Sequence, residues 1–411
     1  MRKIFIFLIL FPVTAFAQTT VEQCYQGARE NYPLTKRYDL IEKTKQYSLK
    51  NAAHAYLPQG GLSAKATIQT DVLTIPMPGV PELSKDQYQV GLEINQAIWD
   101  GGAVHAQKQS IKAGAQVESR QLDVDLYTLN DRVNNLFFGI LTLNEQLVLN
   151  DLLRDELQRN LVTIGTYVAS GIASSSDLDA VKVEILDNRQ KRASILASRD
   201  AYMAMLNALV GFQIKELVKP NIDTYGQIDT LEIKRPELSL FNAQVASIDT
   251  KRYAITAQNM PQIGAFVQGA YGDPGLDMFK LGFTPYAIGG VRLSWNFGKL
   301  YNIKNEKAKI EVEKNTVNAT REAFLFNTNL ELEETKAEVR RLRTQMNDDE
   351  QIILLRGNIK RASEAKVAGG TLSVSDMLSD VTAENAAMQN KALHEIELLM
   401  TIYKIKYKTN N

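Results

Sequence analysis

Apolar residues recur at regular spacings along the stretch from Gly102 to Gly165, which contains no proline. From Leu122 the spacings alternate between four and three, the pattern of a left-handed coiled coil. The seam consists of Leu122, Leu126, Leu129, Val133, Leu136, Ile140, Leu143 and Leu147. The next two positions would be polar, Asn150 and Arg154, so we expect the register to shift there. The displaced stripe would then consist of Leu153, Leu157, Leu161 and Ile164. At 1.5 Å per residue this helix would be roughly 90 Å long, so other long helices must pack along it.

The chain repeats one plan of elements at a spacing of about 200 residues. In the first copy a helix over 33–56 ends at Leu57-Pro58, since proline moves its predecessor out of helical geometry. Two alternating, strand-like segments flank a proline-rich loop and are followed by the long helix and a return helix over 177–210. The alternating positions are Ala64, Ala66, Ile68, Thr70 and Val72, then Tyr88, Val90, Leu92 and Ile94, and the loop prolines are Pro76, Pro78 and Pro81.

The second copy gives the same elements in the same order. A helix over 236–259 stops at Met260-Pro261, strand-like alternation follows at Ile263, Ala265, Val267 and Gly269, and a further run covers 286–295. The second long helix has a seam of Leu325, Leu332, Val339, Leu342 and Met346, with Thr328 and Thr335 between them, and a return helix covers 376–404. We therefore divide the chain into a first repeat at 18–217, a linker at 218–235 and a second repeat at 236–411.

The two turns between the long and return helices, 168–177 and 367–376, match almost position for position. Gly171 and Gly370 are expected to end their helices in a left-handed cap. A serine should then cap the next helix, and an aspartate in its first turn suits the helix dipole. The candidates are Ser175 or Ser176 with Asp177, and Ser373 or Ser375 with Asp376.

Four strands of about ten residues are long enough to cross a bilayer as tilted strands. They also fit two hairpins packed on helices in a soluble α+β protein. Four strands cannot close a barrel, because bare sheet edges in lipid leave backbone groups without hydrogen bonds. If they enter a membrane, several chains must therefore share one barrel. Two chains would give eight strands and three would give twelve, and the spacing alone allows either.

The N-terminus has the features of a secretory signal peptide over residues 1–17. Met1-Arg2-Lys3 is charged, an apolar run follows, and Ala15-Phe16-Ala17 forms a cleavage site before Gln18. No later stretch of about 18 apolar residues predicts a transmembrane helix. The single cysteine, Cys24, cannot form an internal disulfide and is interpreted as a small buried residue on a short helix.

Charge and motif content argue against a nucleic-acid partner and against catalysis. Lysine plus arginine equals aspartate plus glutamate at 47 each, so bulk charge would not hold a nucleic acid. The three histidines, His54, His105 and His394, have no metal-ligand spacing, and there is no phosphate-binding loop or hydrolase motif. His54 and His105 are expected on solvated helix surfaces, and Glu331, Glu333 and Glu334 on an exposed helix face. No catalytic residue, metal ion or cofactor is expected.

The duplicated plan resembles that of TolC-like outer-membrane efflux proteins, the outer-membrane factors of tripartite efflux and type I secretion systems. The resemblance covers the whole mature chain and depends on the order of Leu57-Pro58, Met260-Pro261, Ile98-Trp99-Asp100-Gly101-Gly102 and the paired turns. It implies a mainly α protein with a membrane β-barrel portion. In this homotrimer, an α-helical coiled-coil barrel in the periplasm continues into a shared twelve-stranded barrel in the outer membrane. Short helices, the 211–237 linker and the C-terminus would form a belt.

The resemblance also implies partners and sites. The trimer would be a passive duct for substrates delivered by an inner-membrane transporter and a periplasmic adaptor, and drug efflux, metal efflux and protein secretion remain open as its task. Adaptor docking would involve the turns containing Gly171, Ser176, Asp177, Gly370 and Ser375. Asp376 matches an acidic residue that lines the periplasmic aperture, although it also suits a plain helix start. The second acid of the family pair falls on Ser379, with Asp380 one residue beyond.

Two segments depart from the family pattern. The second strand-to-helix motif is shortened to Asn296-Phe297-Gly298-Lys299, so the exit from that strand should differ. Near the second turn, Val367 and Leu372 are apolar where relatives often carry polar residues that brace the closed aperture. A periplasmic coiled-coil scaffold or adaptor without a barrel is the alternative. Such a protein would have no use for duplicated amphipathic strands.

Overall fold

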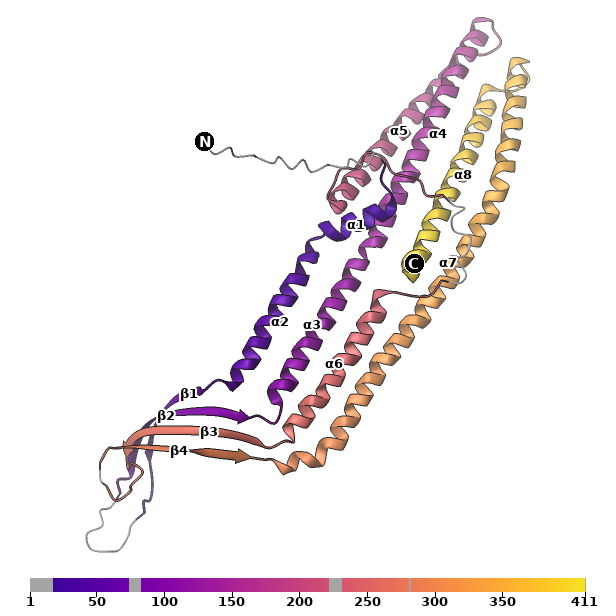
Figure 1. Ribbon diagram of the computed structural model, residues 1–411. Helices are drawn as coiled ribbons and strands as arrows, with labels where there is room; N and C mark the ends of the chain where they lie inside the picture. Colours follow the sequence, from indigo (N-terminus) through magenta and orange to yellow (C-terminus); the bar gives the residue numbers. More distant parts are fainter. Residues whose placement is uncertain (1–17, 74–82, 222–230, 281, 411) are drawn as a thin grey trace, which may run out of the picture. The chain divides into compact units, whose positions relative to one another are not determined.

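The computed structural model describes residues 18–73, 83–221, 231–280 and 282–410 (Figure 1). The expected signal peptide and the loop prolines Pro76, Pro78 and Pro81 lie outside these ranges. The chain forms two compact units. Unit 1 comprises 1–35, 123–236 and 324–411, and unit 2 comprises 36–122 and 237–323. Each unit therefore contains segments of both sequence repeats.

Unit 2 contains a four-stranded antiparallel sheet with the order β1-β2-β3-β4 (Figure 1). The strands are β1 (Gln59–Ile68), β2 (Asp86–Trp99), β3 (Gln262–Asp273) and β4 (Thr284–Ser294). Both strands that follow a helix begin immediately after a proline, Pro58 or Pro261, as expected for the X-Pro pairs. The first strand was expected to reach Val72, but it ends at Ile68, so Thr70 and Val72 lie beyond the sheet.

The helices α2 (Arg37–Ala53) and α6 (Pro236–Gln258) precede the two hairpins. The two strand-to-helix exits differ, as the shortened second motif predicts. After β2, Asp100 accepts hydrogen bonds from the backbone N–H groups of Gly102 and Val104 at 2.9 and 2.6 Å. Gly101 and Gly102 both have positive φ. After β4, Asn296 instead caps a short 3-10 helix by accepting from Gly298 N–H at 3.0 Å.

The expected helix over 102–165 is interrupted once. It consists of α3 (Ala103–Tyr127) and α4 (Leu129–Ala169), with a break at Thr128. The Thr128 hydroxyl donates to the carbonyl of Asp125 at 2.7 Å. The helical ladder is weak at this residue, because the Thr128 N–H lies 3.4 Å from the carbonyl of Val124. The prediction of one uninterrupted helix was therefore wrong at this residue.

Unit 1 is helical, and its main elements form two antiparallel pairs. The first pair is α4 with α5 (Ser175–Val210), and the second is the end of α7 (Ile303–Ala368) with α8 (Val374–Thr409). The short helix α1 (Val21–Asn31) begins with a capping box in which Thr20 and Gln23 bond each other's backbone. By length and composition alone, the helical run 103–169 is long and apolar enough to cross a membrane, contrary to the sequence expectation. It contains α4 residues of the main buried cluster, and core helices pass the same test.

The seam of α4 continues without the expected shift. Asn150, which was expected to leave the seam, is fully buried, and Leu157 and Ile164 follow in the same four-three register. Asn150 and Asn188 of α5 each donate a side-chain hydrogen bond to the other's backbone carbonyl, at 3.3 and 3.2 Å. This reciprocal pairing satisfies the side-chain NH₂ groups of both residues, while Asn150 Oδ1 is buried without a hydrogen-bond partner. The predicted register shift was therefore wrong, although the four residues of the stripe do pack together: Leu157 and Ile164 are buried in one cluster, and Leu153 and Leu161 pack against it.

The seam of α7 agrees with the sequence pattern. Thr328, Leu332, Thr335, Val339 and Leu342 are buried, and Leu325 and Met346 are half-buried. Each threonine hydroxyl bonds a carbonyl one turn earlier, so it adds no unsatisfied group to the seam. The seam then continues through a buried polar pair, in which His394 Nδ1 lies 2.8 Å from Asp349 Oδ2.

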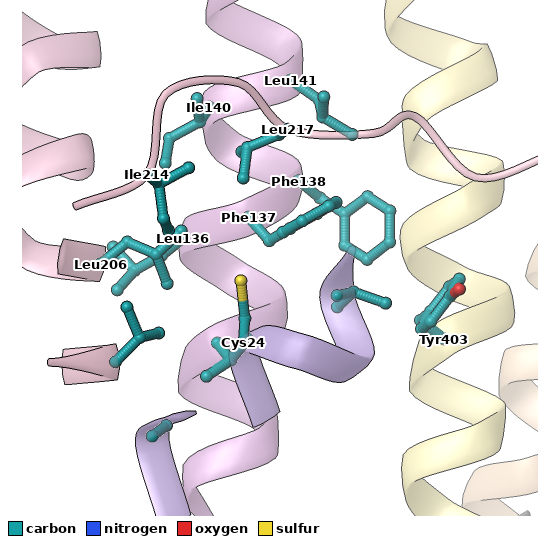
Figure 2. Close-up of a cluster of buried hydrophobic side chains, with 14 of the residues drawn as sticks. Cys24, Leu136, Phe137, Phe138, Ile140, Leu141, Leu206, Ile214, Leu217 and Tyr403 are labelled. Atoms are coloured by element: carbon teal, nitrogen blue, oxygen red, sulfur yellow. The ribbon is translucent and has the colours of Figure 1, made fainter. Parts of the chain in front are cut away.

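The largest buried cluster joins α1 to α4, α5 and α8 (Figure 2). Cys24 points into it beside Phe137 and Phe138, and Tyr403 packs against Phe138 with 5.2 Å between ring centres. The expected burial of Cys24 on a short helix is confirmed, and burial raises the pKa of its thiol to about 12. A parallel β-bridge between Thr19 and Leu217 holds the linker beside this cluster.

Candidate functional site

The first of the two turns connects α4 to α5, and a glycine in the left-handed conformation ends α4 there. Gly171 has φ +76°. The N–H groups of Gly171 and Ile172 donate to the carbonyls of Val168 and Tyr167 at 3.1 and 2.9 Å, which together form a Schellman motif. A Cβ added at Gly171 would meet no atom within 4 Å. The backbone conformation, rather than crowding, therefore requires glycine here.

The helix after this turn begins with a capping box on Ser174. Ser174 Oγ accepts from the N–H of Asp177 at 3.2 Å, and Asp177 Oδ2 accepts from the N–H of Ser174 at 2.8 Å. Hydrogen bonds from the Ser174 N–H and then from its hydroxyl lower the pKa of Asp177. The expected caps, Ser175 or Ser176, were wrong because α5 already begins at Ser175. Ser176 instead lies with its hydroxyl 2.7 Å from Ser174 Oγ.

The second turn repeats these bonds 199 residues later, as Gly370 follows Gly171. Gly370 has φ +68°. Its N–H and that of Thr371 donate to the carbonyls of Val367 and Lys366, both at 2.9 Å. Ser373, one of the two expected caps, accepts from the N–H of Asp376 at 3.1 Å. Ser375 is exposed inside the first turn of α8.

The two turns pack on one another through a shared cluster of buried apolar side chains. Val367 is buried in this cluster and Leu372 packs against it, so the two apolar residues that depart from the family pattern join the turns. A hollow of about 400 Å³ lies between the turns. Ile172, Asp177, Gly370 and Leu372 are among its lining residues.

The three expected aperture residues lie at the start of α8. Asp376 and Ser379 are three residues apart on the helix and both are exposed. Asp376 Oδ2 accepts a hydrogen bond from the Ser373 hydroxyl at 2.6 Å. Asp380 is half-buried and accepts a hydrogen bond from Ser363 of α7. The structure thus leaves two of the three residues open to solvent and ties the third to the neighbouring helix.

The sheet of unit 2 has one apolar and one polar face. The register aligns apolar residues of all four strands on one side, and several are exposed by half or more of their surface. The large ones are Leu62, Ile68, Tyr88, Val90, Leu92, Val267, Tyr271, Val291 and Leu293. The other side carries mostly small and polar residues, among them Ser63, Lys65, Gln89, Glu93, Asn95, Gln268, Arg292 and Ser294. A soluble protein rarely leaves such a large apolar surface uncovered.

Aromatic side chains mark both ends of the strands. At one end the Phe283 ring lies 5.4 Å from Tyr271 and 6.4 Å from Tyr88, centre to centre. At the other end Trp295 lies 4.6 Å from Phe297, and its indole N–H donates to the carbonyl of Asn259 at 3.0 Å. Aromatic residues collect at both interfaces of membrane barrels, with an apolar band between them.

Two charged residues with defined surroundings were not among the predicted site residues. Lys360 lies in the α7 seam and contacts Glu156 of α4 and Glu384 of α8 at 2.7 and 2.5 Å. Continuing the four-three spacing past Asp349 would have found it. Arg292 is the one charged residue in the alternating run at 286–295, and it points to the polar side of the sheet. Its position in that alternation was the available signal.

The histidines expected on the surface, His54 and His105, are exposed as predicted, and so are Glu331, Glu333 and Glu334. Within the described ranges, no group of three or more His, Cys, Asp or Glu side chains is placed to hold a metal ion.

The fold is similar to that of solved outer-membrane proteins. No protein-family model and no curated protein sequence matches the chain. The crystal structure of CusC, a protein that forms a transmembrane channel, matches this chain with a TM-score of 0.67 and 12% sequence identity. The match covers 95% of this chain and 91% of CusC. The Campylobacter jejuni CmeC outer membrane channel matches with TM-score 0.63, 11% identity, and 95% and 85% coverage. The outer membrane protein VceC from Vibrio cholerae matches with TM-score 0.63, 13% identity, and 95% and 94% coverage. The chain therefore has the fold of these outer-membrane channel proteins, as its resemblance to TolC-like proteins implies.

Proposed function

We propose that this chain is the subunit of an outer-membrane exit duct, a passive conduit for substrates delivered by an inner-membrane pump and a periplasmic adaptor. The observation that carries the proposal is the sheet with one exposed apolar face and one polar face. In a membrane barrel, strands alternate between lipid-facing apolar and lumen-facing polar residues. The exposed face from Leu62 to Leu293 would contact the outer-membrane lipid, and the polar face would line the lumen.

Strand length and flanking residues support the same location. The strands have 10 to 14 residues, and a tilted strand needs about 9 to 11 to cross the hydrocarbon core. The aromatic clusters at Phe283 and Trp295 would then lie at the two interfaces between lipid and water.

The sheet edges support assembly from several copies. The outer sides of β1 and β4 are the edges of the sheet within one chain. An edge in lipid leaves backbone N–H and C=O groups without partners at a cost of several kcal/mol each. Pairing β4 of one copy with β1 of the next removes every edge. We take three copies, which give twelve strands, from the resemblance to TolC-like proteins.

The helical pairs of unit 1 would form the periplasmic part of the duct, and the segments around Thr19, Leu217 and the C-terminus its belt. The matched turns at Gly171 and Gly370 are the proposed docking surface for the adaptor. Both turns have the same two backbone hydrogen bonds after the helix and a serine cap, which gives one chain two similar docking elements, 199 residues apart in sequence. Asp376 and Ser379, with Asp380 behind them, are the proposed lining of the aperture.

A periplasmic scaffold without a barrel is the alternative, and the exposed apolar face argues against it. The structural neighbours are channel proteins rather than enzymes. Fractionation and light scattering separate the two hypotheses. The duct should sediment with outer membranes, require detergent for extraction and give a mass of three chains after subtraction of detergent. A stable monomer obtained without detergent would contradict the barrel.

The aperture proposal has its own test. Three copies of Asp376 around one axis would concentrate cations in a narrow mouth, as acidic rings do in cation-selective pores. In planar-bilayer recordings, Asp376→Asn should reduce both cation preference and block by trivalent cations added at the periplasmic side. Asp177→Asn is the matched control at the equivalent position of the other turn and should change these properties much less. Equal behaviour of the wild type and Asp376→Asn would move the aperture to other residues.

A further inference from the structure

We propose that the polar face of the sheet carries a weak binding site for small anions with a planar aromatic body, centred on Arg292 and Phe266. This inference rests on the proposed duct, because the polar face would line its lumen. It goes beyond the duct by naming a class of solute that the barrel wall recognises. The barrel would then take part in selecting its cargo instead of being an inert wall.

The site is a hollow of about 270 Å³ where β2, β3 and β4 meet the helical part of unit 2. Gly264 and Ala97, which pair across β3 and β2, line it without large side chains. The residue paired with Arg292 across the strands is Gly264, and that paired with Phe266 is Gly290. A Cβ added at Gly290 would lie 3.2 Å from the Phe266 ring, so the ring lies directly over this glycine. Gly290 thus makes room for the ring itself, and Gly264, two residues from Phe266 on the same face, leaves space for a ligand beside it.

The charged group of the hollow is a guanidinium above an aromatic ring. Arg292 Cζ lies 4.9 Å from the centre of the Phe266 ring. Among the described residues, no carboxylate forms an ion pair with Arg292. Glu93 lies on the same face of the sheet as Arg292. The strand register puts it two strands away and four residues, or about 13 Å, further along the strand direction. The five N–H donors of Arg292 are therefore available for an outside acceptor.

The preference for an anion comes from Arg292, and the other polar side chains of the hollow add neutral groups and one carboxylate whose oxygens are already in use. Gln262 and Ser294 line it and offer amide or hydroxyl donors, whereas the amide of Asn95, also in the lining, already donates to the Glu93 carboxylate at 3.0 Å. Asp100 is the carboxylate in the lining, and it already accepts hydrogen bonds from Tyr56, Gly102 and Val104 at 2.7, 2.9 and 2.6 Å. Arginine binds a carboxylate through two parallel hydrogen bonds, and the planar guanidinium stacked on Phe266, together with the edge of that ring, offers contacts to an aromatic solute. The geometry thus suits an aromatic carboxylate of about the size of benzoate.

A site in an exit duct must also release its ligand. The hollow is open to solvent and Arg292 is exposed, so binding should be weak, with a dissociation constant near the millimolar range. Weak sites that a solute enters and leaves readily are compatible with conduction. Threefold symmetry would place three such sites at one height in the lumen.

Binding of benzoate to the detergent-purified full-length protein tests the site. Saturation-transfer NMR should detect benzoate, and benzylamine, which has the same ring and the opposite charge, should bind at least tenfold more weakly. Arg292→Gln should weaken benzoate binding tenfold or more, and Arg292→Lys should restore only part of it because lysine lacks the planar pair of donors. Phe266→Leu should reduce the preference for benzoate over cyclohexanecarboxylate. Lys65→Gln is the matched control, since it removes one positive charge from the same face on β1.

Benzoate binding that is equal in the wild type and Arg292→Gln would overturn the site, as would equal binding of benzylamine. A loss in Lys65→Gln as large as that in Arg292→Gln would also overturn it, since the effect would then be one of general charge. Light scattering on the same samples separates this proposal from the duct. Arg292-dependent binding to a protein that is not a trimer would support the hollow and contradict the duct. A trimer that binds benzoate equally well with and without Arg292 would support the duct and contradict the hollow.

Discussion

At the scale of single residues, two glycines determine the geometry of the helical turns. Gly171 and Gly370 have positive φ and open space where a side chain would be. Any other residue would therefore be strained by its backbone and not by its neighbours. The left-handed conformation costs an ordinary L-residue roughly 1 to 2 kcal/mol. The neighbouring Gly369 does not have positive φ, which provides a comparison one residue away.

Gly370→Ala should destabilise the second turn by about 1 kcal/mol, whereas Gly369→Ala should cost little or nothing. Hydrogen exchange at the start of α8 would measure the difference in protection. If the turn is the docking surface, Gly370→Val should also weaken pull-down of the cognate adaptor while leaving the trimer intact. Undiminished adaptor binding in both Gly171→Val and Gly370→Val would place docking elsewhere on the molecule.

Asp177 gives the first turn a pH dependence. Its pKa is lowered by hydrogen bonds from the N–H and hydroxyl of Ser174. A group whose pKa is lower in the folded state stabilises the fold above its unfolded pKa, near 4, and this contribution is lost as the pH falls through the folded value. Exchange protection of the first turn of α5 should therefore decrease below about pH 4. In Asp177→Asn the profile should be flat over the same range, and an unchanged acid profile would remove Asp177 as the cause.

The capping residues also show what local sequence can predict. The serine-rich stretches and the glycines correctly placed both turns. In the second turn they named the cap, Ser373, as one of two candidates. In the first turn the choice among Ser174, Ser175 and Ser176 depended on where α5 starts, and a difference of one residue decides it. Several adjacent serines have the same capping chemistry, so composition alone could not choose among them.

At the scale of elements, periodicity predicted the helices well and their interruptions poorly. The α7 seam is buried where the pattern placed it. The break at Thr128 is a local weakening of the backbone hydrogen bonds, with 3.4 Å between its nitrogen and the Val124 carbonyl oxygen, and the pattern of apolar residues does not record it. Burial of Asn150 depends on a second asparagine, Asn188, on another helix. The polarity of Asn150 suggested that it would leave the seam. The pairing that buries it could not be foreseen from the local pattern, because its partner lies 38 residues away.

The ion cluster around Lys360 holds three helices together within unit 1. Burial alone would lower the pKa of Lys360, but its hydrogen bonds to Glu156 and Glu384 outweigh this, and the pKa is raised. A raised pKa means that the lysine contributes stability below its unfolded value, near 10.5, and that the contribution is lost as the pH rises through the folded value. At neutral pH the Lys360 ammonium is therefore protonated and pairs with both carboxylates.

Lys360→Met should lower stability by roughly 1 to 3 kcal/mol, since two partly buried carboxylates would lose their shared partner. The expected readout is a decrease of several degrees in the thermal midpoint of the helical circular-dichroism signal. Lys366→Met, an exposed lysine on the same helix, is the control and should change the midpoint little. Equal midpoints for Lys360→Met and the wild type would show that the cluster is only a surface contact.

At the scale of the whole molecule, the sequence indicated the four strands but could not choose the number of chains in a barrel. Alternation at Tyr88, Val90 and Leu92 gave the apolar face, since one face of a strand has a period of two residues. The role of Arg292 was not predictable in the same way. It depends on Gly264 and Gly290, which become neighbours only once β3 and β4 pair in their observed register. Chain number depends on contacts between copies, which no pattern within one chain specifies.

Contacts between the sheet edges of different copies can be detected with engineered disulfides. Within one chain, β1 and β4 are separated by two strands, and a strand spacing of about 4.8 Å puts them roughly 14 Å apart. A disulfide needs Cα atoms within about 7 Å, so it cannot join these strands inside a flat or gently curved four-stranded sheet. Cysteines introduced on both edges can therefore bond only between copies. The native Cys24 is buried and does not interfere.

The experiment combines Ala64→Cys on β1 with single cysteines placed along β4, at Ala287, Gly289 or Val291, which share the face of Ala64. Oxidation in outer membranes should produce, at one β4 position, a ladder on non-reducing gels that ends at three chains. Cysteines at Val90 and Tyr271, direct partners within the chain, are the control and should give only monomers. A ladder that ends at two chains would make the barrel eight-stranded. Absence of any ladder at every β4 position, with the control pair oxidised, would mean that the edges of different copies do not meet and that the sheet serves something other than a shared barrel.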